Sequence, residues 1–213
     1  MTRRSGARQF LKALYSPDDR ERFKAALDLG IFADRQWSEK PDAVRQLLRR
    51  LAWSLNEESG ATGWGAPEAI GEIAARIPEM EQLYGSVFPG YLSHAEVFLD
   101  NAILDTGALW AIGRLGPGSP ADVPALDEDL PRFLQSESGS VRGAAVYAAG
   151  QLGRSGLRSL VSELRTDDAP LILPLHGIIM DVTVAELAEA AVFSLDAVAT
   201  SEAGSSPPHG SVR

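Results

Sequence analysis

The sequence predicts an all-α protein built as a short α–α superhelix, with one small β-hairpin near residues 171–182. Three observations support this fold class. Apolar residues recur at spacings of three and four along most of the chain, which is the periodicity of amphipathic helices. Proline and glycine interrupt these segments at short intervals. A short string of small residues and leucine also returns several times, which is typical of stacked helical repeats.

The composition is that of a folded protein without disulfides. The chain has 213 residues, of which 45% are apolar, enough for one sizeable core or a short row of stacked units. It has no cysteine, so disulfides, thiolate metal sites and cysteine nucleophiles are excluded. The basic start is followed by too few apolar residues before Ser16-Pro17 to form a signal peptide. No apolar run approaches the roughly 20 residues that a membrane span needs. We therefore expect a cytoplasmic protein that does not contact a membrane.

The first helices are expected at residues 7–15 and 18–33. Ser16-Pro17 separates them, because proline cannot continue a helix. Asp18 stands at the start of the second helix, where the helix dipole favours a negative charge. Pro41 suits the first position of a third helix. Its apolar stripe follows helical spacing: Val44, Leu47, Leu48, Leu51 and Leu55.

Further helices are expected in the rest of the chain. Ser93-His94-Ala95-Glu96 has the pattern of a capping box ahead of one of them, and Pro89-Gly90 is expected to stop the helix before it. Ser140 is expected to cap another. The expected helices cover residues 67–77, 79–88, 93–115, 126–135, 141–152 and 156–165.

The last part of the chain changes character. Two apolar runs flank His176-Gly177 and predict the hairpin of residues 171–182. Thr183 then caps a last helix to about Leu195. Residues 196–213 are poor in apolar side chains and are expected to form a disordered tail. The prediction is one domain over residues 1–195.

The repeated string identifies the kind of helical array. Near copies occur at residues 25–30, 111–116 and 148–153, and a weaker copy occurs at 74–78. The last two strong copies stand 37 residues apart, which is room for two helices per unit. Small residues in the string would let neighbouring helices approach closely. The segment Ser140-Val141-Arg142-Gly143-Ala144-Ala145-Val146-Tyr147-Ala148-Ala149-Gly150-Gln151-Leu152-Gly153 strongly resembles the first helix of a HEAT-like repeat of the type also found in phycobilisome-lyase-like proteins. That resemblance implies an α-solenoid.

The segment from residue 56 to 72 looks like a special joint in this array. It contains the string Asn56-Glu57-Glu58-Ser59-Gly60 and then Gly63-Trp64-Gly65-Ala66-Pro67-Glu68-Ala69. These strings resemble an uncharacterised family of bacterial HEAT-like proteins, a resemblance that implies a fold and no activity. If the flanking helices are antiparallel neighbours, the joint gathers a polar group of side chains around one mouth: Asn56, Glu57, Glu58, Trp64, Glu68 and Glu72.

Three roles are open for this group. The polar side chains could accept backbone amides of the glycine-rich turn and brace it, form a surface for a protein partner, or act as a metal or acid/base centre. Glu57 and Glu58 at the last turn of a helix oppose the helix dipole, and such local conflicts are expected at functional sites. The turn lacks the patterns of phosphate-binding loops.

The scarce histidines limit the chemistry further. HEAT-like di-iron hydroxylases use His-Glu pairs, and none of His94, His176 and His209 is followed by glutamate. HEAT-like alkylpurine DNA glycosylases keep aromatic residues and an aspartate in a basic groove, and Trp110 with Asp105 would match only in part. No metal or other cofactor is expected.

Charge is distributed unevenly along the chain. Residues 1–50 hold 12 Lys/Arg and 7 Asp/Glu, which is +5, whereas residues 51–213 hold 8 and 22, which is −14. An acidic body repels phosphate backbones, so nucleic-acid binding is disfavoured. The sequence favours a non-catalytic interaction or scaffold module with a concave acidic surface around residues 56–72 and a protein partner, a basic segment being one candidate. The alternative is a metal-dependent or acid/base enzyme centred on Glu57, Glu58, Glu68 and Glu72.

Overall fold

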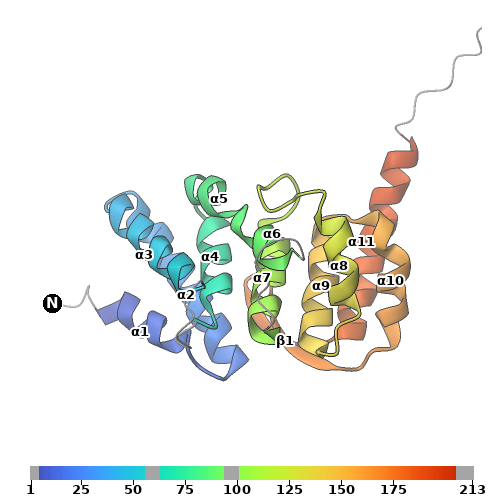
Figure 1. Cartoon of the computed structure of the whole chain (residues 1–213), viewed down its shortest axis with the longest axis horizontal. Helices are drawn as coiled ribbons and strands as arrows, with labels where there is room; N and C mark the ends of the chain where they lie inside the picture. The colour runs from blue at the N-terminus through green and yellow to red at the C-terminus, as the bar shows by residue number, and fades with distance from the viewer. Residues whose placement is uncertain (1–4, 56–62, 94–100, 205–213) are drawn as a thin grey trace, which may run out of the picture.

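A computed structural model describes residues 5–55, 63–93 and 101–204 and confirms the all-α repeat fold with a small antiparallel hairpin (Figure 1). Its α-helices are α1 (Ser5–Ala13), α2 (Asp19–Trp37), α3 (Pro41–Ser54), α4 (Ala66–Ala74), α5 (Pro78–Tyr84), α6 (Val87–Leu92), α7 (Ala102–Leu115), α8 (Leu126–Leu134), α9 (Gly139–Gln151), α10 (Arg158–Glu163) and α11 (Val184–Gly204). Two short 3-10 helices, Ser155–Leu157 and Leu164–Thr166, flank α10. The strands are β1 (Pro170–Leu175) and β2 (Ile178–Thr183).

The helices stack as successive pairs. Helices α2, α4, α7, α9 and α11 pack one against the next and form a row, which we call the inner row. Helices α1, α3, α8 and α10 pack on members of the inner row from outside, and the short helices α5 and α6 take the corresponding place beside α4 and α7. Figure 1 shows the pairs following one another from the N-terminal to the C-terminal end of the body. This arrangement is the predicted solenoid.

Small residues set the spacing of the inner row, as the repeated string predicted. At each contact between neighbouring inner helices, a glycine lies so close to the next helix that a Cβ atom would meet it within 3 Å. The pairs are Gly30 with Glu72 Cγ at 2.5 Å, Gly71 with Ala111 Cβ at 2.5 Å, Gly113 with the Tyr147 ring at 2.7 Å, and Gly150 with Ala191 Cβ at 2.9 Å. Each distance leaves no room for a side chain.

The hairpin connects α10 to α11 and packs back on the inner row. Its strands pair from Pro170↔Thr183 to Leu175↔Ile178 about the His176-Gly177 turn, as the sequence predicted. His176 has φ 52° and Gly177 has φ 80°, both in the left-handed region that tight hairpin turns require. β1 contacts α9 and α2, and β2 contacts α2 and α11. The hairpin therefore bridges inner helices that belong to distant repeats.

Two contacts fix the hairpin in this position. The buried indole N–H of Trp110 on α7 donates a hydrogen bond of 2.9 Å to the carbonyl of Pro174. At the other edge, Arg20 of α2 forms an ion pair with Asp181 of β2. The Trp110 ring also meets Phe23 of α2 edge to face, with the ring centroids 5.6 Å apart. One tryptophan thus joins α2, α7 and the hairpin.

Some predicted helix boundaries are corrected. Helix α7 begins at Ala102, because the Asn101 side chain caps it by accepting the amides of Ile103 and Leu104. The capping box expected ahead of it includes residues 94–96, which lie outside the described residues. Helix α9 is capped by Ser138 and not by Ser140, because Ser138 has the extended backbone of a cap and accepts the amide of Val141.

Two further predictions of helix ends are wrong. Pro89-Gly90 lies within the short helix α6 and does not end a helix, because a proline in the first turn has no amide hydrogen bond to lose. Helix α11 continues to Gly204, so the segment expected to be disordered from residue 196 begins too early. Asp196 forms an ion pair with Arg158, and Val198 lies 3.3 Å from the Cβ position of Gly153, so the body holds this part of the helix. The predicted cap at Thr183 is confirmed by reciprocal hydrogen bonds with Glu186.

Replacing Gly71 with alanine tests the spacing of the inner row. A Cβ atom at this position would lie 2.5 Å from Ala111 Cβ and 2.9 Å from Ala111 Cα, so α4 and α7 must move apart. We expect the free energy of unfolding to fall by about 1–3 kcal/mol, although alanine is the better helix former. Urea denaturation measures the free energy of unfolding of each variant. The control is Gly156→Ala, whose Cβ would meet nothing within 4 Å. Equal stability of the two variants would contradict the close packing.

Candidate functional site

In the described part of the predicted joint, Gly65 packs against the segment between α1 and α2. The amide of Gly65 donates a hydrogen bond of 2.9 Å to the carbonyl of Leu14, and a Cβ atom at Gly65 would lie 3.1 Å from that oxygen. Trp64 is half-buried beside it. Asn56, Glu57 and Glu58 lie outside the described residues. The convergence of all six predicted residues at one mouth therefore stays a prediction.

Glu68 lies in the buried layer between inner helices. Its side chain is 1% exposed, and its carboxyl group packs on Gly107 of α7, where a Cβ atom would lie 2.6 Å from Oε2. Burial raises the pKa of Glu68 to about 8, while its own backbone amide and the charge of Arg22 lower it and Asp19 raises it. Glu68 is therefore mainly protonated at neutral pH, a state in which the carboxyl is a poor metal ligand.

Glu72 is equally buried but is held as a paired carboxylate. Its Oε1 accepts a hydrogen bond of 2.6 Å from Nε of Arg76, one turn further along the chain. Its Oε2 accepts a hydrogen bond of 2.8 Å from Nε of Arg114 on α7. Glu72 is 1% exposed, whereas the Arg76 and Arg114 side chains are 29% and 35% exposed. The buried carboxylate thus fixes two arginines whose outer ends reach the surface.

These arginines line a groove over the inner row. A cavity of about 320 Å³ lies between the C-terminal ends of α4, α7 and α9 and the hairpin turn. Its lining comes from α2, α7 and α9, from the turn that follows α4, and from β1 and the hairpin turn: Leu27, Arg76, Trp110, Gly113, Arg114, Tyr147, Gln151, Pro174, His176 and Gly177. The charged groups in this lining are arginines, with His176 beside them.

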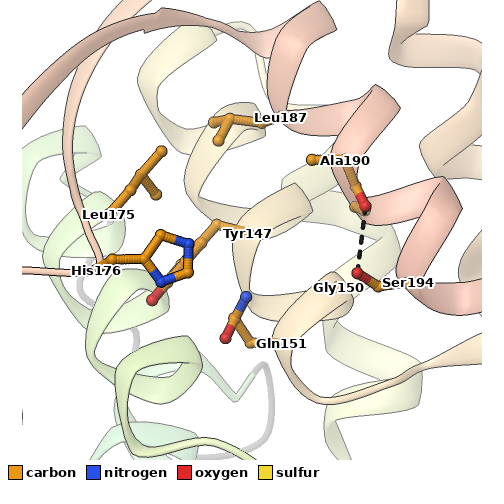
Figure 2. A pocket seen from close by; sticks show the side chains of 9 residues that line it. Tyr147, Gly150, Gln151, Leu175, His176, Leu187, Ala190 and Ser194 are labelled. Carbon is orange, nitrogen blue, oxygen red and sulfur yellow. Dashed lines mark hydrogen bonds between the residues drawn. The ribbon is translucent and has the colours of Figure 1, made fainter.

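A second cavity of about 100 Å³ adjoins the first one and continues towards α11. Tyr147, Gln151 and His176 line both cavities. Figure 2 shows these three side chains together, with Leu187 and Ala190 of α11 across the space from them. The remaining lining is mostly apolar: Gly150, Leu175, Leu187, Ala190, Ala191 and Ser194. We call the two cavities together the inner groove.

Sequence reasoning missed the inner groove, although the repeat held a signal for it. When the four repeat copies are aligned by their last aliphatic residue, the equivalent position holds Asp28, Arg76, Arg114 and Gln151. In the structure Arg76, Arg114 and Gln151 line one cavity, whereas Asp28 pairs with Lys24. A polar residue that recurs at one position of successive repeats faces one side of the row. The sequence predicted that His176 lies in the hairpin turn. Its place beside Tyr147 and Gln151 of α9 could not be predicted, because it depends on how the folded hairpin packs.

The described residues offer no ready metal centre. Over residues 5–55, 63–93 and 101–204, no three histidine, aspartate or glutamate side chains are grouped so that they could hold a metal ion. Within these same ranges, no helix is both long and apolar enough to cross a membrane.

Comparisons with known proteins support the fold. No protein-family model matches the chain. An uncharacterised protein of Archaeoglobus fulgidus is 38% identical over 84 residues, which is 39% of this chain and only 43% of that relative. Among solved structures, a designed armadillo repeat protein in complex with the peptide (KR)4 is similar, with a TM-score of 0.51 and 18% identity over 87% of this chain and 80% of the other. An engineered protein has a TM-score of 0.52 and 17% identity, over 93% and 85% of the two chains. The fold is that of armadillo-like and HEAT-like helical repeats.

The raised pKa of Glu68 predicts how stability changes with pH. The folded chain keeps this proton up to about pH 8, whereas the unfolded chain loses it near the ordinary value of 4.5, so the folded state binds more protons between these values. This group therefore lowers the free energy of unfolding as the pH rises through that range, by up to about 1.4 kcal/mol per pH unit. Glu68→Gln should remove this part of the slope.

Urea denaturation at several pH values between the two pKa values measures the slope. The matched control is Glu79→Gln, the same change at an exposed glutamate of α5, which should leave the slope as it is in the native chain. If Glu68→Gln also leaves the slope unchanged, Glu68 is charged in the folded state.

Proposed function

We propose that this protein is a non-catalytic interaction module that holds a segment of a protein partner in the inner groove. The observation that carries the proposal is the groove itself, which runs over successive inner helices and takes polar side chains from equivalent repeat positions. Such a row can follow an extended chain, because each repeat offers the same kind of contact at a regular interval.

The structural neighbour adds support at the level of the fold. The designed armadillo repeat protein is in complex with the peptide (KR)4, so a helical row of this kind can hold a peptide. The same chemistry does not transfer to the inner groove, which presents Arg76 and Arg114 where a basic peptide would need acidic groups. We therefore propose a segment with an acidic group for this groove, in place of the basic segment expected from the net charge. Binding at the acidic surface predicted around residues 56–72 stays a separate prediction.

The geometry favours binding over catalysis. The alternative enzyme needs Glu68 and Glu72 to reach a substrate together with Glu57 and Glu58. Glu68 and Glu72 are each 1% exposed, and Glu72 already pairs with two arginines.

A cytoplasmic location remains an expectation from the sequence.

Site-specific cross-linking in the native host tests the proposed function. A photoreactive amino acid replaces Gln151 in the inner groove or, as a control, Arg49 on the exposed face of α3. Both positions are exposed, so neither substitution should disturb folding. We expect a discrete cross-linked adduct with a protein partner at position 151 and none at position 49. Adducts of equal yield at both positions, or an adduct at position 49 alone, would contradict a partner site in the groove.

A further inference from the structure

The larger cavity of the inner groove has an unbalanced positive charge. Arg76 and Arg114 bring two positive charges, and Glu72 beneath them supplies one negative charge. Among the described residues, none that lines this cavity is acidic. The excess is therefore one positive charge at a site that is partly shielded from water, where it acts more strongly than on the open surface.

The guanidinium groups keep donors for a ligand. Each uses its Nε to bond Glu72, and within the described part of the chain no other hydrogen bond engages Arg76 or Arg114. The Nη groups therefore remain as donors on two guanidinium groups that the carboxylate already holds. Fixed Arg donors suit a carboxylate, which can accept two parallel N–H bonds. Because the ion pairs hold the arginine side chains before binding, little of their conformational entropy remains to be lost.

Two neutral polar groups stand beside the arginines. Burial raises the pKa of the Tyr147 hydroxyl, so it stays protonated at neutral pH and can donate a hydrogen bond. The Gln151 amide occupies the repeat position equivalent to Arg76 and Arg114 and lines the same cavity. Both side chains also border the smaller, mostly apolar cavity. A ligand can therefore place a charged group and an apolar group in adjoining spaces.

We propose that the inner groove binds the C-terminal residue of a partner protein, with its carboxylate on Arg76 and Arg114 and its apolar side chain in the smaller cavity between α9 and α11. A C-terminal residue joins one carboxylate to one side chain at a single carbon atom, which matches the order of the two cavities. This inference rests on the proposed function and names the group of the partner that is recognised.

The charge of the site favours a carboxylate over a phosphate. A carboxylate carries one negative charge, which equals the excess positive charge of the site, whereas a phosphate group carries about 1.5 to 2 at neutral pH. The body around the groove is acidic, since residues 51–213 carry a net charge of −14, and it repels a more highly charged anion more strongly.

Titration of the full chain with small probes tests the inference. The readout is the chemical shift of the arginine Nε–Hε and glutamine side-chain signals by NMR. The main probe is N-acetyl-L-valine. N-acetyl-L-valinamide lacks the carboxylate, N-acetylglycine lacks the apolar side chain, and inorganic phosphate is a different anion. We expect N-acetyl-L-valine to shift the Arg76, Arg114 and Gln151 signals with saturation, N-acetylglycine to bind more weakly, and the amide and phosphate to bind least.

Variants separate the site from a general charge effect. Arg114→Gln should raise the dissociation constant for N-acetyl-L-valine about tenfold or more, because a charge-assisted hydrogen bond is lost. Arg49→Gln, at an exposed arginine of α3, should leave the constant unchanged. Arg76→Gln provides a second variant if Arg114→Gln fails to fold, and circular dichroism checks the fold of each.

Several results would overturn the inference: no saturable shift with N-acetyl-L-valine, equal binding of the amide or of phosphate, or an affinity that neither arginine variant changes. These results leave the proposed function standing if cross-linking at position 151 still yields a partner. If position 151 yields no adduct but N-acetyl-L-valine still binds, the groove is a carboxylate site for a small molecule. This result would contradict the protein partner.

Discussion

The buried carboxylate of Glu72 is the interaction on which the inner groove depends. It lies between α2 and α7, with its Cγ 2.5 Å from the Cβ position of Gly30, so its place exists only because residue 30 has no side chain. From there it bonds Arg76 on its own chain segment and Arg114 on the next inner helix. A charge removed from water needs such partners. The same bonds hold two arginines that line the groove, so the packing of the row and the charge of the groove have one cause.

The hairpin completes the groove that the helices begin. A solenoid leaves one face of its inner row open, and here β1 and β2 lie against that face between α2, α9 and α11. The bond from Trp110 to the Pro174 carbonyl holds the end of β1 close to α7, which brings His176 to the border of both cavities. The helical repeat thus supplies a regular row of contacts, and an element inserted between α10 and α11 turns one face of that row into a partly shielded groove.

Local signals in the sequence were sufficient for the fold and insufficient for the site. Periodic apolar residues, the glycine of the repeated string and the His176-Gly177 turn each act over a few residues, so the helices, their close packing and the hairpin could be predicted. The sequence predicted Ser140 as the cap of α9, whereas the structure shows Ser138, because both serines precede the same apolar run. The pairing of Glu72 with Arg114 spans 42 positions, and the contact of Trp110 with Pro174 spans 64. The spacing of Glu68 and Glu72 suggested an acidic mouth. The structure buries both carboxylates instead. Their burial depends on α2 and α7, which no local pattern around residues 68–72 contains.

The most direct test of this account is the behaviour of the two arginines in solution. NMR of the native chain measures how fast the Nε–Hε protons of Arg76 and Arg114 exchange with water at neutral pH. A hydrogen bond to a buried carboxylate should slow both protons relative to that of exposed Arg49, and Glu72→Gln should abolish the difference while Glu79→Gln preserves it. Exchange of Arg76 and Arg114 as fast as that of Arg49 in the native chain would show that Glu72 does not hold them, and the groove described here would lose its basis.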